Sequence, residues 1–229
     1  MQIFETIWPA QQQISEYKKT GKTIGFVPTM GALHEGHLEL MRRAKAENDI
    51  LVVSIFVNPI QFNNPADLEK YPRTPEKDKA MLRQVKCDML FAPDVEEMYP
   101  EPDNTIYQFG KLASVMEGAF RPGHFNGVAV VVRKLFDILT PDKAYFGEKD
   151  YQQLAIIQSL VKQFSIPVEI IPCPIVREKD GLAMSSRNIR LSDNERAIAP
   201  KIYEILKKAV SLRKVLSPFE MEQYASKEL

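Results

Sequence analysis

Short apolar runs rich in β-branched residues alternate along this chain with longer segments of helical periodicity. The apolar runs lie at 22–27, 49–57, 87–92, 143–147 and 168–172. Helical patterns occupy residues 75–86, 128–139 and 152–164. This alternation predicts an α/β fold, a Rossmann-like parallel sheet with helices on both faces. The stretch ILVVSIFV is apolar nearly throughout, which predicts a central strand covered on both sides.

A polar stretch at 176–188, VREKDGLAMSSRN, predicts a boundary between two domains. After it, Ser192 and Glu195 have the spacing of a capping box, which predicts a helix from about 194 to 210. We therefore expect a main domain at 1–175 and a small helical C-terminal lobe at 176–229.

The charge is balanced, with 30 acidic and 30 basic residues, so nothing indicates a protein that coats nucleic acid or binds a membrane surface. Small-molecule partners are expected instead. The two cysteines, Cys87 and Cys173, share no motif spacing, which argues against a disulfide scaffold or a thiolate metal site and is typical of a reduced, cytoplasmic compartment. No signal-peptide pattern and no stretch near the ~20 apolar residues of a membrane span is present, so a soluble, unprocessed protein is expected.

Two of the three histidines, His34 and His37, flank Gly36 in the stretch GALHEGHLEL. The preceding TIGFVPTM predicts a strand that ends at Pro28, Gly31 permits a turn, and a helix is expected to follow. Ligands of open α/β sheets bind at such a strand-to-helix junction, where the helix N–H groups attract anions. The pattern predicts imidazole donors for phosphate oxygens that gain charge in a transition state.

Two other interpretations of the histidine pair stay open. The imidazoles could bind zinc, although HEGH lacks the H-E-x-x-H spacing and only His124 remains as a third nitrogen ligand. They could also be polar residues that only cap a helix. A second nucleotide-like stretch, KKTGKT at 18–23, resembles a Walker loop but lacks its first glycine and precedes a strand, so it is interpreted as a turn.

Six stretches between about residues 3 and 191 occur in a specific order: PTMGALHEGH, FVNPIQF, DLEKYPRT, RPGHFNGVAVVV, FGEKDYQQL and MSSRN. With them the chain closely resembles the pantothenate synthetase family, in the adenylate-forming nucleotidylyltransferase superfamily. The resemblance implies condensation of pantoate with β-alanine through a pantoyl adenylate, using ATP and magnesium and releasing AMP and pyrophosphate. It also implies a homodimer.

The resemblance implies roles for residues in these stretches. His34 and His37 are expected to contact the ATP phosphates, with His37 as the acid, and Lys149 is expected to be catalytic with them. Gln61 and Gln153 are expected to bind pantoate, because an amide hydrogen-bonds hydroxyls and a carboxylate without adding a charge. The residues expected to contact ATP are Met30, Gly31, Ala32, Leu33, His34, Glu35, Gly36, His37, Gly147, Glu148, Lys149, Asp150, Val176, Met184, Ser185, Ser186 and Arg187.

The magnesium ligands stay unassigned, because magnesium keeps several waters and needs few protein ligands. Asp78 is a candidate, but its neighbours Lys77 and Met81 are not the oxygen ligands that some relatives have there. Arg121 and His124 are further candidates on the substrate side.

Two other functions are kept. Another nucleotidylyltransferase of the superfamily would act on a phosphorylated acceptor and would need cations where this chain has Gln61 and Gln153. The second alternative is an ATP-binding module with impaired turnover. Its basis is the C-terminal lobe, where Ser217, Pro218 and Glu220 form a capping box that starts a helix close to residue 229. The C-terminal lobe is therefore expected to be shorter than in the family.

Overall fold

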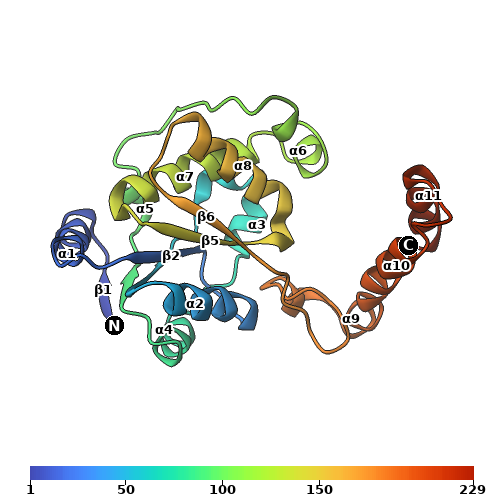
Figure 1. Ribbon diagram of the computed structural model, residues 1–229, viewed down its shortest axis with the longest axis horizontal. Helices are drawn as coiled ribbons and strands as arrows, with labels where there is room; N and C mark the ends of the chain where they lie inside the picture. Colours follow the sequence, from blue (N-terminus) through green and yellow to red (C-terminus); the bar gives the residue numbers. More distant parts are fainter. The chain divides into compact units, whose positions relative to one another are not determined.

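A six-stranded parallel sheet organises the larger of two compact units (Figure 1). The computed structural model describes residues 1–229, divided into the units Met1–Pro174 and Ile175–Leu229. The strand order is β1-β4-β3-β2-β5-β6, and every neighbouring pair is parallel. The strands are β1 (Gln2–Phe4), β2 (Ile24–Thr29), β3 (Ile50–Ile55), β4 (Met89–Phe91), β5 (Lys143–Gly147) and β6 (Glu169–Cys173). The predicted α/β sheet is confirmed, and the long apolar run forms β3 in its interior.

Helices cover both faces of this sheet, as predicted (Figure 1). Along β2, Phe26 packs in one hydrophobic cluster with side chains of α1, α7 and α8, whereas Val27 packs in a second cluster with side chains of α2 and α4. This period of two is the normal consequence of strand geometry. The helices of the first unit are α1 (Ile7–Lys19), α2 (Glu35–Glu47), α3 (Pro65–Glu69), α4 (Pro75–Gln84), α5 (Val95–Met98), α6 (Glu117–Phe120), α7 (His124–Leu139) and α8 (Tyr151–Gln163).

The prediction that Pro28 ends the first apolar strand is wrong, because β2 continues to Thr29. Beyond Phe26, β2 pairs only with β3, so Pro28 lies where the strand has a single neighbour and its missing N–H is tolerated. No sequence pattern predicted β1 or α1. The interpretation of KKTGKT as a turn is confirmed, since α1 ends at Lys19 and Gly21 has φ +72° just before β2.

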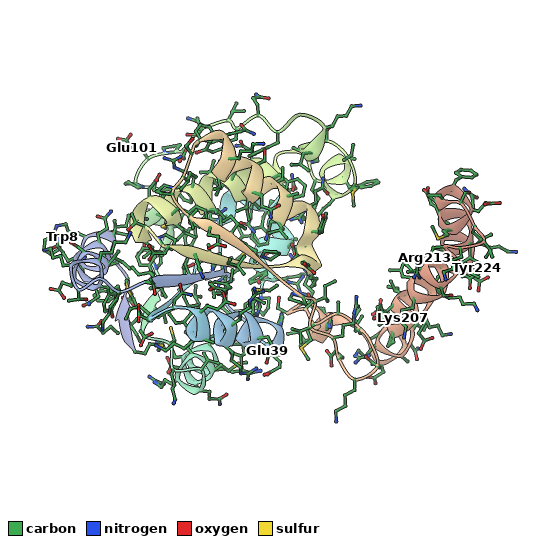
Figure 2. The ribbon with its side chains drawn as sticks, in the orientation of Figure 1. Trp8, Glu39, Glu101, Lys207, Arg213 and Tyr224 are labelled. Atoms are coloured by element: carbon green, nitrogen blue, oxygen red, sulfur yellow. The ribbon has the colours of Figure 1, made fainter.

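Helix α2 is amphipathic and is anchored to the sheet at its C-terminal end. Leu38 and Met41 are buried, whereas Glu39 lies on the exposed side, where it pairs with Arg42 (Figure 2). The buried Tyr145 hydroxyl of β5 donates to Glu47 Oε2 at 2.9 Å, which ties the last turn of α2 to the sheet. The first turn of α2 therefore lies beside the carboxyl end of β2.

The second unit consists of a short bridged turn followed by helices. Its helices are η4 (Asn188–Arg190), α9 (Asp193–Ile198), α10 (Pro200–Ser211) and α11 (Pro218–Glu228). Both predicted capping boxes are confirmed, Ser192 with Glu195 and Ser217 with Glu220. The single helix expected at 194–210 is wrong: it is divided at Pro200, which lacks an N–H to continue α9 and instead begins α10.

No helix of either unit combines the length and the apolarity that crossing a lipid bilayer requires.

Candidate active site

The candidate site lies where the strand order reverses. From β2 the chain adds β3 and then β4 on one side, whereas β5 and β6 extend the sheet on the other. The loops that follow β2, β3 and β5 therefore meet at one edge, the usual ligand position in an open parallel sheet. They carry the two histidines, Gln61 and Lys149.

His34 and His37 form a compact pair at the start of α2. His34 is the N-cap residue and His37 is the third helical residue, with ring centroids 4.0 Å apart. The backbone N–H of His34 donates to His37 Nδ1 at 3.3 Å. Because Nδ1 accepts this bond, the proton of the neutral His37 ring lies on Nε2, where it can be donated to a ligand.

The charge state of His37 follows from its surroundings. Burial, reinforced by the neighbouring His34 and Lys149, lowers the pKa of His37 to about 3. The ring is therefore neutral near pH 7. It can supply a hydrogen bond to a growing negative charge, but it does not carry the extra proton that a histidine acting as a general acid would release.

The loop between β2 and α2 has an unusual backbone. Gly31 has φ +80° and Ala32 has φ +49°, so two consecutive residues are left-handed. The Asp78 carboxylate lies beneath this loop and accepts from the backbone N–H groups of Ala32 and Leu33, at 3.0 and 2.8 Å. Sequence reasoning had considered Asp78 only as a metal ligand, and no local pattern links it to residues more than 40 positions earlier.

Gln61 and Met30 are brought together, with Gln61 Nε2 3.1 Å from Met30 Sδ. Gln61 lies in the short helix η1 (Pro59–Gln61) and is buried. Asn58 Nδ2 donates to Gln61 Oε1 at 3.1 Å, and His124 Nδ1 lies 2.8 Å from the Gln61 carbonyl oxygen. His124 therefore holds the backbone that presents Gln61.

Two further residues around Gln61 escaped the sequence analysis. The Tyr99 hydroxyl donates to Asn58 Oδ1 at 2.9 Å, fixing the orientation of that amide. Gly127 in α7 lets the helix approach η1 so closely that a Cβ there would lie 2.5 Å from the Ile60 carbonyl oxygen. The FVNPIQF and RPGHFNGV stretches were recognised, but nothing in either one indicates that they touch.

The segment after β5 supplies the cationic side of the site. Gly147 ends the strand and η3 (Glu148–Asp150) leads into α8, as the sequence predicted. Lys149 Nζ lies 3.0 Å from Asp150 Oδ1, and its charge acts on His37. Gln153 is half-buried in the first turn of α8.

Gln152, the residue before Gln153, has a structural function. Gln152 is buried, accepts from the Glu117 N–H at 3.0 Å, and donates to the carbonyl oxygens of Leu112 and Val115 at 2.8 Å each. These bonds hold the segment before α7 against α8. Arg121 in that segment pairs with Glu117.

The other predicted nucleotide contacts form one turn of the second unit. Met184 N–H donates to the Val176 carbonyl oxygen at 3.0 Å, and Arg187 N–H donates to Ser185 Oγ at 3.2 Å. Ser186 lies between them in the same half-buried turn, so the MSSRN stretch forms a short, internally bonded loop.

The side chains do not form a metal centre of the usual kind. No group of three or more His, Cys, Asp or Glu residues is placed so that it could hold a metal ion. His124, the third nitrogen ligand that the zinc interpretation required, faces the Gln61 carbonyl oxygen instead. The zinc interpretation therefore has no support in this arrangement.

Comparison with known proteins gives one consistent result. The family model described as pantoate-beta-alanine ligase matches residues 2–229. The chain is 55% identical over 229 residues to pantothenate synthetase from Porphyromonas gingivalis, covering 100% of this chain and 82% of that protein. It is 54% identical over 212 residues to the enzyme of the same name from Rhizobium rhizogenes, covering 93% of this chain and 73% of that one.

Solved structures agree. Pantothenate synthetase from Thermus thermophilus superposes with a TM-score of 0.94 at 44% identity, covering 100% of this chain and 82% of that chain. Pantoate-beta-alanine ligase from Francisella tularensis, complexed with beta-gamma ATP and beta-alanine, gives 0.88 at 42% identity, covering 100% and 86%. Since the family model spans nearly the whole sequence and relatives share more than half of its residues, the chain belongs to the pantoate-beta-alanine ligase family.

Proposed function

We propose that this protein is a ligase that condenses (R)-pantoate with β-alanine to give pantothenate, using ATP and releasing AMP and pyrophosphate. The observation that carries the proposal is the meeting of His34, His37 and Lys149 with the neutral Gln61 at the switch point of the sheet, in a chain of this family. These groups match what the reaction requires: donors for a triphosphate, and a neutral amide that can bind a hydroxy acid.

The first step activates the acid. An oxygen of the pantoate carboxylate attacks the α-phosphorus of ATP, the bond from that phosphorus to the bridging oxygen breaks, and pyrophosphate leaves with the electron pair. Negative charge builds on the phosphate oxygens. The Nε2–H of His37, the Lys149 ammonium and the N–H groups at the start of α2 are the donors that stabilise it.

The second step forms the amide. The amine of β-alanine attacks the acyl carbon of pantoyl adenylate and AMP leaves with the electron pair of the broken bond. The amine must be neutral to attack, and it loses a proton as the amide forms. A site that excludes water protects the adenylate from hydrolysis in the meantime.

The predicted contacts divide between the substrates. Gln61 and Gln153 bind the hydroxyls and carboxylate of pantoate. Met30, whose sulfur lies 3.1 Å from Gln61 Nε2, is assigned to ATP. Asp150 accepts from the ribose hydroxyls. The remaining ATP contacts are assigned to Gly31, Ala32, Leu33, Glu35, Gly36, Gly147, Glu148, Val176, Met184, Ser185, Ser186 and Arg187.

Magnesium enters this proposal only as part of the ATP substrate. The acidic side chains do not cluster at the site, and both Asp78 oxygens already accept hydrogen bonds. We therefore assign no protein ligand to the ion. This fits a cation that keeps most of its water and binds phosphate oxygens.

Another nucleotidylyltransferase activity is the first alternative. A phosphorylated acceptor would need cations in the second pocket, where the buried side chain is the neutral Gln61. An ATP-binding module that turns over slowly is the other alternative, and only turnover separates it from the ligase.

The deciding experiment is a turnover assay with pantoate and β-alanine supplied together or singly. Steady release of AMP and pyrophosphate, with pantothenate detected by mass spectrometry, is expected only when both are present. His37→Ala should lower the rate about 100- to 1,000-fold, because it removes one preorganised donor at the developing charge. ATP binding without turnover would favour the module, and near-normal turnover of His37→Ala would remove this residue from the mechanism.

A cytoplasmic homodimer completes the proposal. Its support is the resemblance, the buried cysteines that form no disulfide, and the exposed apolar side chains of Met116, Phe120 and Tyr151 near the Gln152 contacts. Light scattering should give a dimer mass for the wild type and for Trp8→Ser, a control on the exposed face of α1. Phe120→Ser should shift the mass toward the monomer, and a monomeric wild type would contradict the dimer.

A further inference from the structure

Asp78 is a charged side chain that is almost completely buried, with 1% of its surface exposed. It lies in the first turn of α4, where the helix end favours a negative charge. Its Oδ2 accepts from the Ala32 N–H at 3.0 Å, and its Oδ1 accepts from the Leu33 N–H at 2.8 Å and the Thr74 hydroxyl at 3.0 Å. Three donors and a helix end thus stabilise the carboxylate.

The backbone that Asp78 holds is one that the chain does not adopt readily. Gly31 and Ala32 are both left-handed, at φ +80° and +49°, and alanine seldom occupies this region. A Cβ on Gly31 would lie 3.1 Å from Asp78 Oδ2, so the glycine also makes room for the carboxylate. The bonds to Ala32 and Leu33 therefore compensate for an unfavourable loop conformation.

This loop leads directly into the histidine pair. Leu33 is followed by His34, the N-cap of α2, whose N–H in turn sets the tautomer of His37. A carboxylate that fixes residues 32 and 33 thereby fixes where both imidazoles and the first N–H groups of α2 lie.

We infer that Asp78 is a positioning residue of the active site: through the backbone of Ala32 and Leu33, it holds the β2–α2 loop in its nucleotide-binding conformation. The inference rests on the proposed function and adds to it a residue that does not touch substrate. It differs from a metal-ligand role in what the carboxylate holds, namely the backbone N–H groups of Ala32 and Leu33 and the Thr74 hydroxyl.

The first test is Asp78→Asn, which keeps the shape but turns one acceptor into a donor. kcat/KM for ATP should fall about 10- to 100-fold, the range expected for losing a charged hydrogen bond to a buried group. KM for pantoate and KM for β-alanine should change by less than about twofold, because the loop is proposed to act on ATP alone. The matched control is Glu76→Gln on the same helix, where the exposed carboxylate pairs only with Lys79 and kinetics should not change.

The second test uses the strain of the loop. In the Asp78→Asn background, Ala32→Gly should recover about three- to tenfold of kcat/KM for ATP, because glycine adopts a positive φ without cost. If Asp78→Asn does not fold, Thr74→Val, which removes one donor to the carboxylate, should show the same selective loss on a smaller scale.

Three results would overturn the inference: equal losses for ATP and pantoate, no recovery with Ala32→Gly, or full recovery when magnesium is raised far above ATP. The last would make Asp78 a metal ligand. Calorimetry with ATP alone separates this inference from the proposed function. If the wild type binds ATP but forms no pantothenate, the function fails, while the comparison of ATP affinities still decides the role of Asp78.

Discussion

His37 shows how a single backbone contact decides what a side chain can do. A histidine free in solution is a proton donor and acceptor near neutral pH. Here the His34 N–H occupies Nδ1, and burial keeps the ring neutral, so only the Nε2–H is available to a ligand. The residue is therefore suited to stabilise the charge of a pentacoordinate phosphorus rather than to transfer a proton.

The low pKa of His37 predicts an acid-sensitive contribution to stability. Below its ordinary pKa of about 6.5 the unfolded chain binds a proton at this ring, whereas the folded protein excludes that proton until pH falls to about 3. The contribution is thus fully present above about pH 6.5 and is lost as the pH falls, by up to about 1.4 kcal/mol per pH unit.

Urea unfolding of the wild type and of His37→Gln at several pH values between 7 and 4 measures this effect. The free energy of unfolding of the wild type should decline more steeply in acid than that of the variant, which has no titrating group there. Parallel curves would show that His37 titrates normally in the folded state.

The two sides of the site are expected to respond separately to mutation. Gln61→Ala and Gln153→Ala should raise KM for pantoate about 10-fold or more, as expected when one hydrogen bond to a polar substrate is lost, with ATP affinity almost unchanged. Lys149→Ala should weaken ATP binding and leave pantoate binding intact. Calorimetry with each ligand alone decides, and equal damage to both ligands by all three variants would contradict the division.

At the scale of elements, the position of Gln61 depends on how closely α7 packs against η1. Gly127→Ala would place a Cβ 2.5 Å from the Ile60 carbonyl oxygen and 2.8 Å from the Gln61 Cα, both backbone atoms. The elements must then separate, at a cost of about 1–3 kcal/mol. We expect a lower free energy of unfolding together with a higher KM for pantoate and an unchanged KM for ATP.

Gly123→Ala is the comparison for this prediction. Gly123 precedes the same helix and has open space around it, but its φ is +79°, so the change adds backbone strain without a clash. It should cost stability and spare the pantoate KM. A normal pantoate KM for Gly127→Ala would show that the packing of α7 does not control Gln61.

Prolines explain where the predicted elements were wrong. The sequence predicted that Pro28 ends a strand, but β2 continues through it to Thr29. The sequence also predicted one helix through Pro200, but a new helix begins there. A missing backbone N–H destabilises an element only where a carbonyl oxygen would otherwise accept a hydrogen bond from it. At Pro28 the strand has one neighbour, whereas at Pro200 the continuing helix would have needed the bond.

At the scale of the whole molecule, the chain divides into two compact units, and each contains some of the residues that the resemblance assigns to ATP. Residues 1–174 contain the sheet, both hydrophobic clusters, the histidine pair and Lys149. Expressed alone, this unit should fold cooperatively and bind ATP weakly, because it retains the first turn of α2. It should not form pantothenate, since Ser185, Ser186 and Arg187 are absent.

Circular dichroism and calorimetry test the fold and the binding, and the turnover assay tests the activity. The full chain with Ser185→Ala, Ser186→Ala and Arg187→Ala is the control, because it removes these three proposed contacts without removing the unit. Full activity of residues 1–174 would exclude the MSSRN stretch from the reaction.

The sequence by itself determined the features that depend on neighbouring residues. Patterns only a few positions long specify the alternating strands and helices, the turn at Gly21, and the capping boxes of α9 and α11. The same holds for the histidine pair at the start of α2, since a helix N-terminus and its cap are local structures. The edge strand β1 was missed because three residues carry too little periodicity to be recognised.

Only the tertiary structure decided which of these features meet. The sheet order places β2 between β3 and β5, which brings Gln61 and Lys149 to the histidines, although no local pattern specifies strand order. The support residues are also distant in sequence: Asp78 bonds to Ala32 and Leu33, and His124 contacts Gln61 across 63 positions. Such contacts arise because packing the helices on the sheet buries polar groups, which must then find partners wherever the fold has placed them.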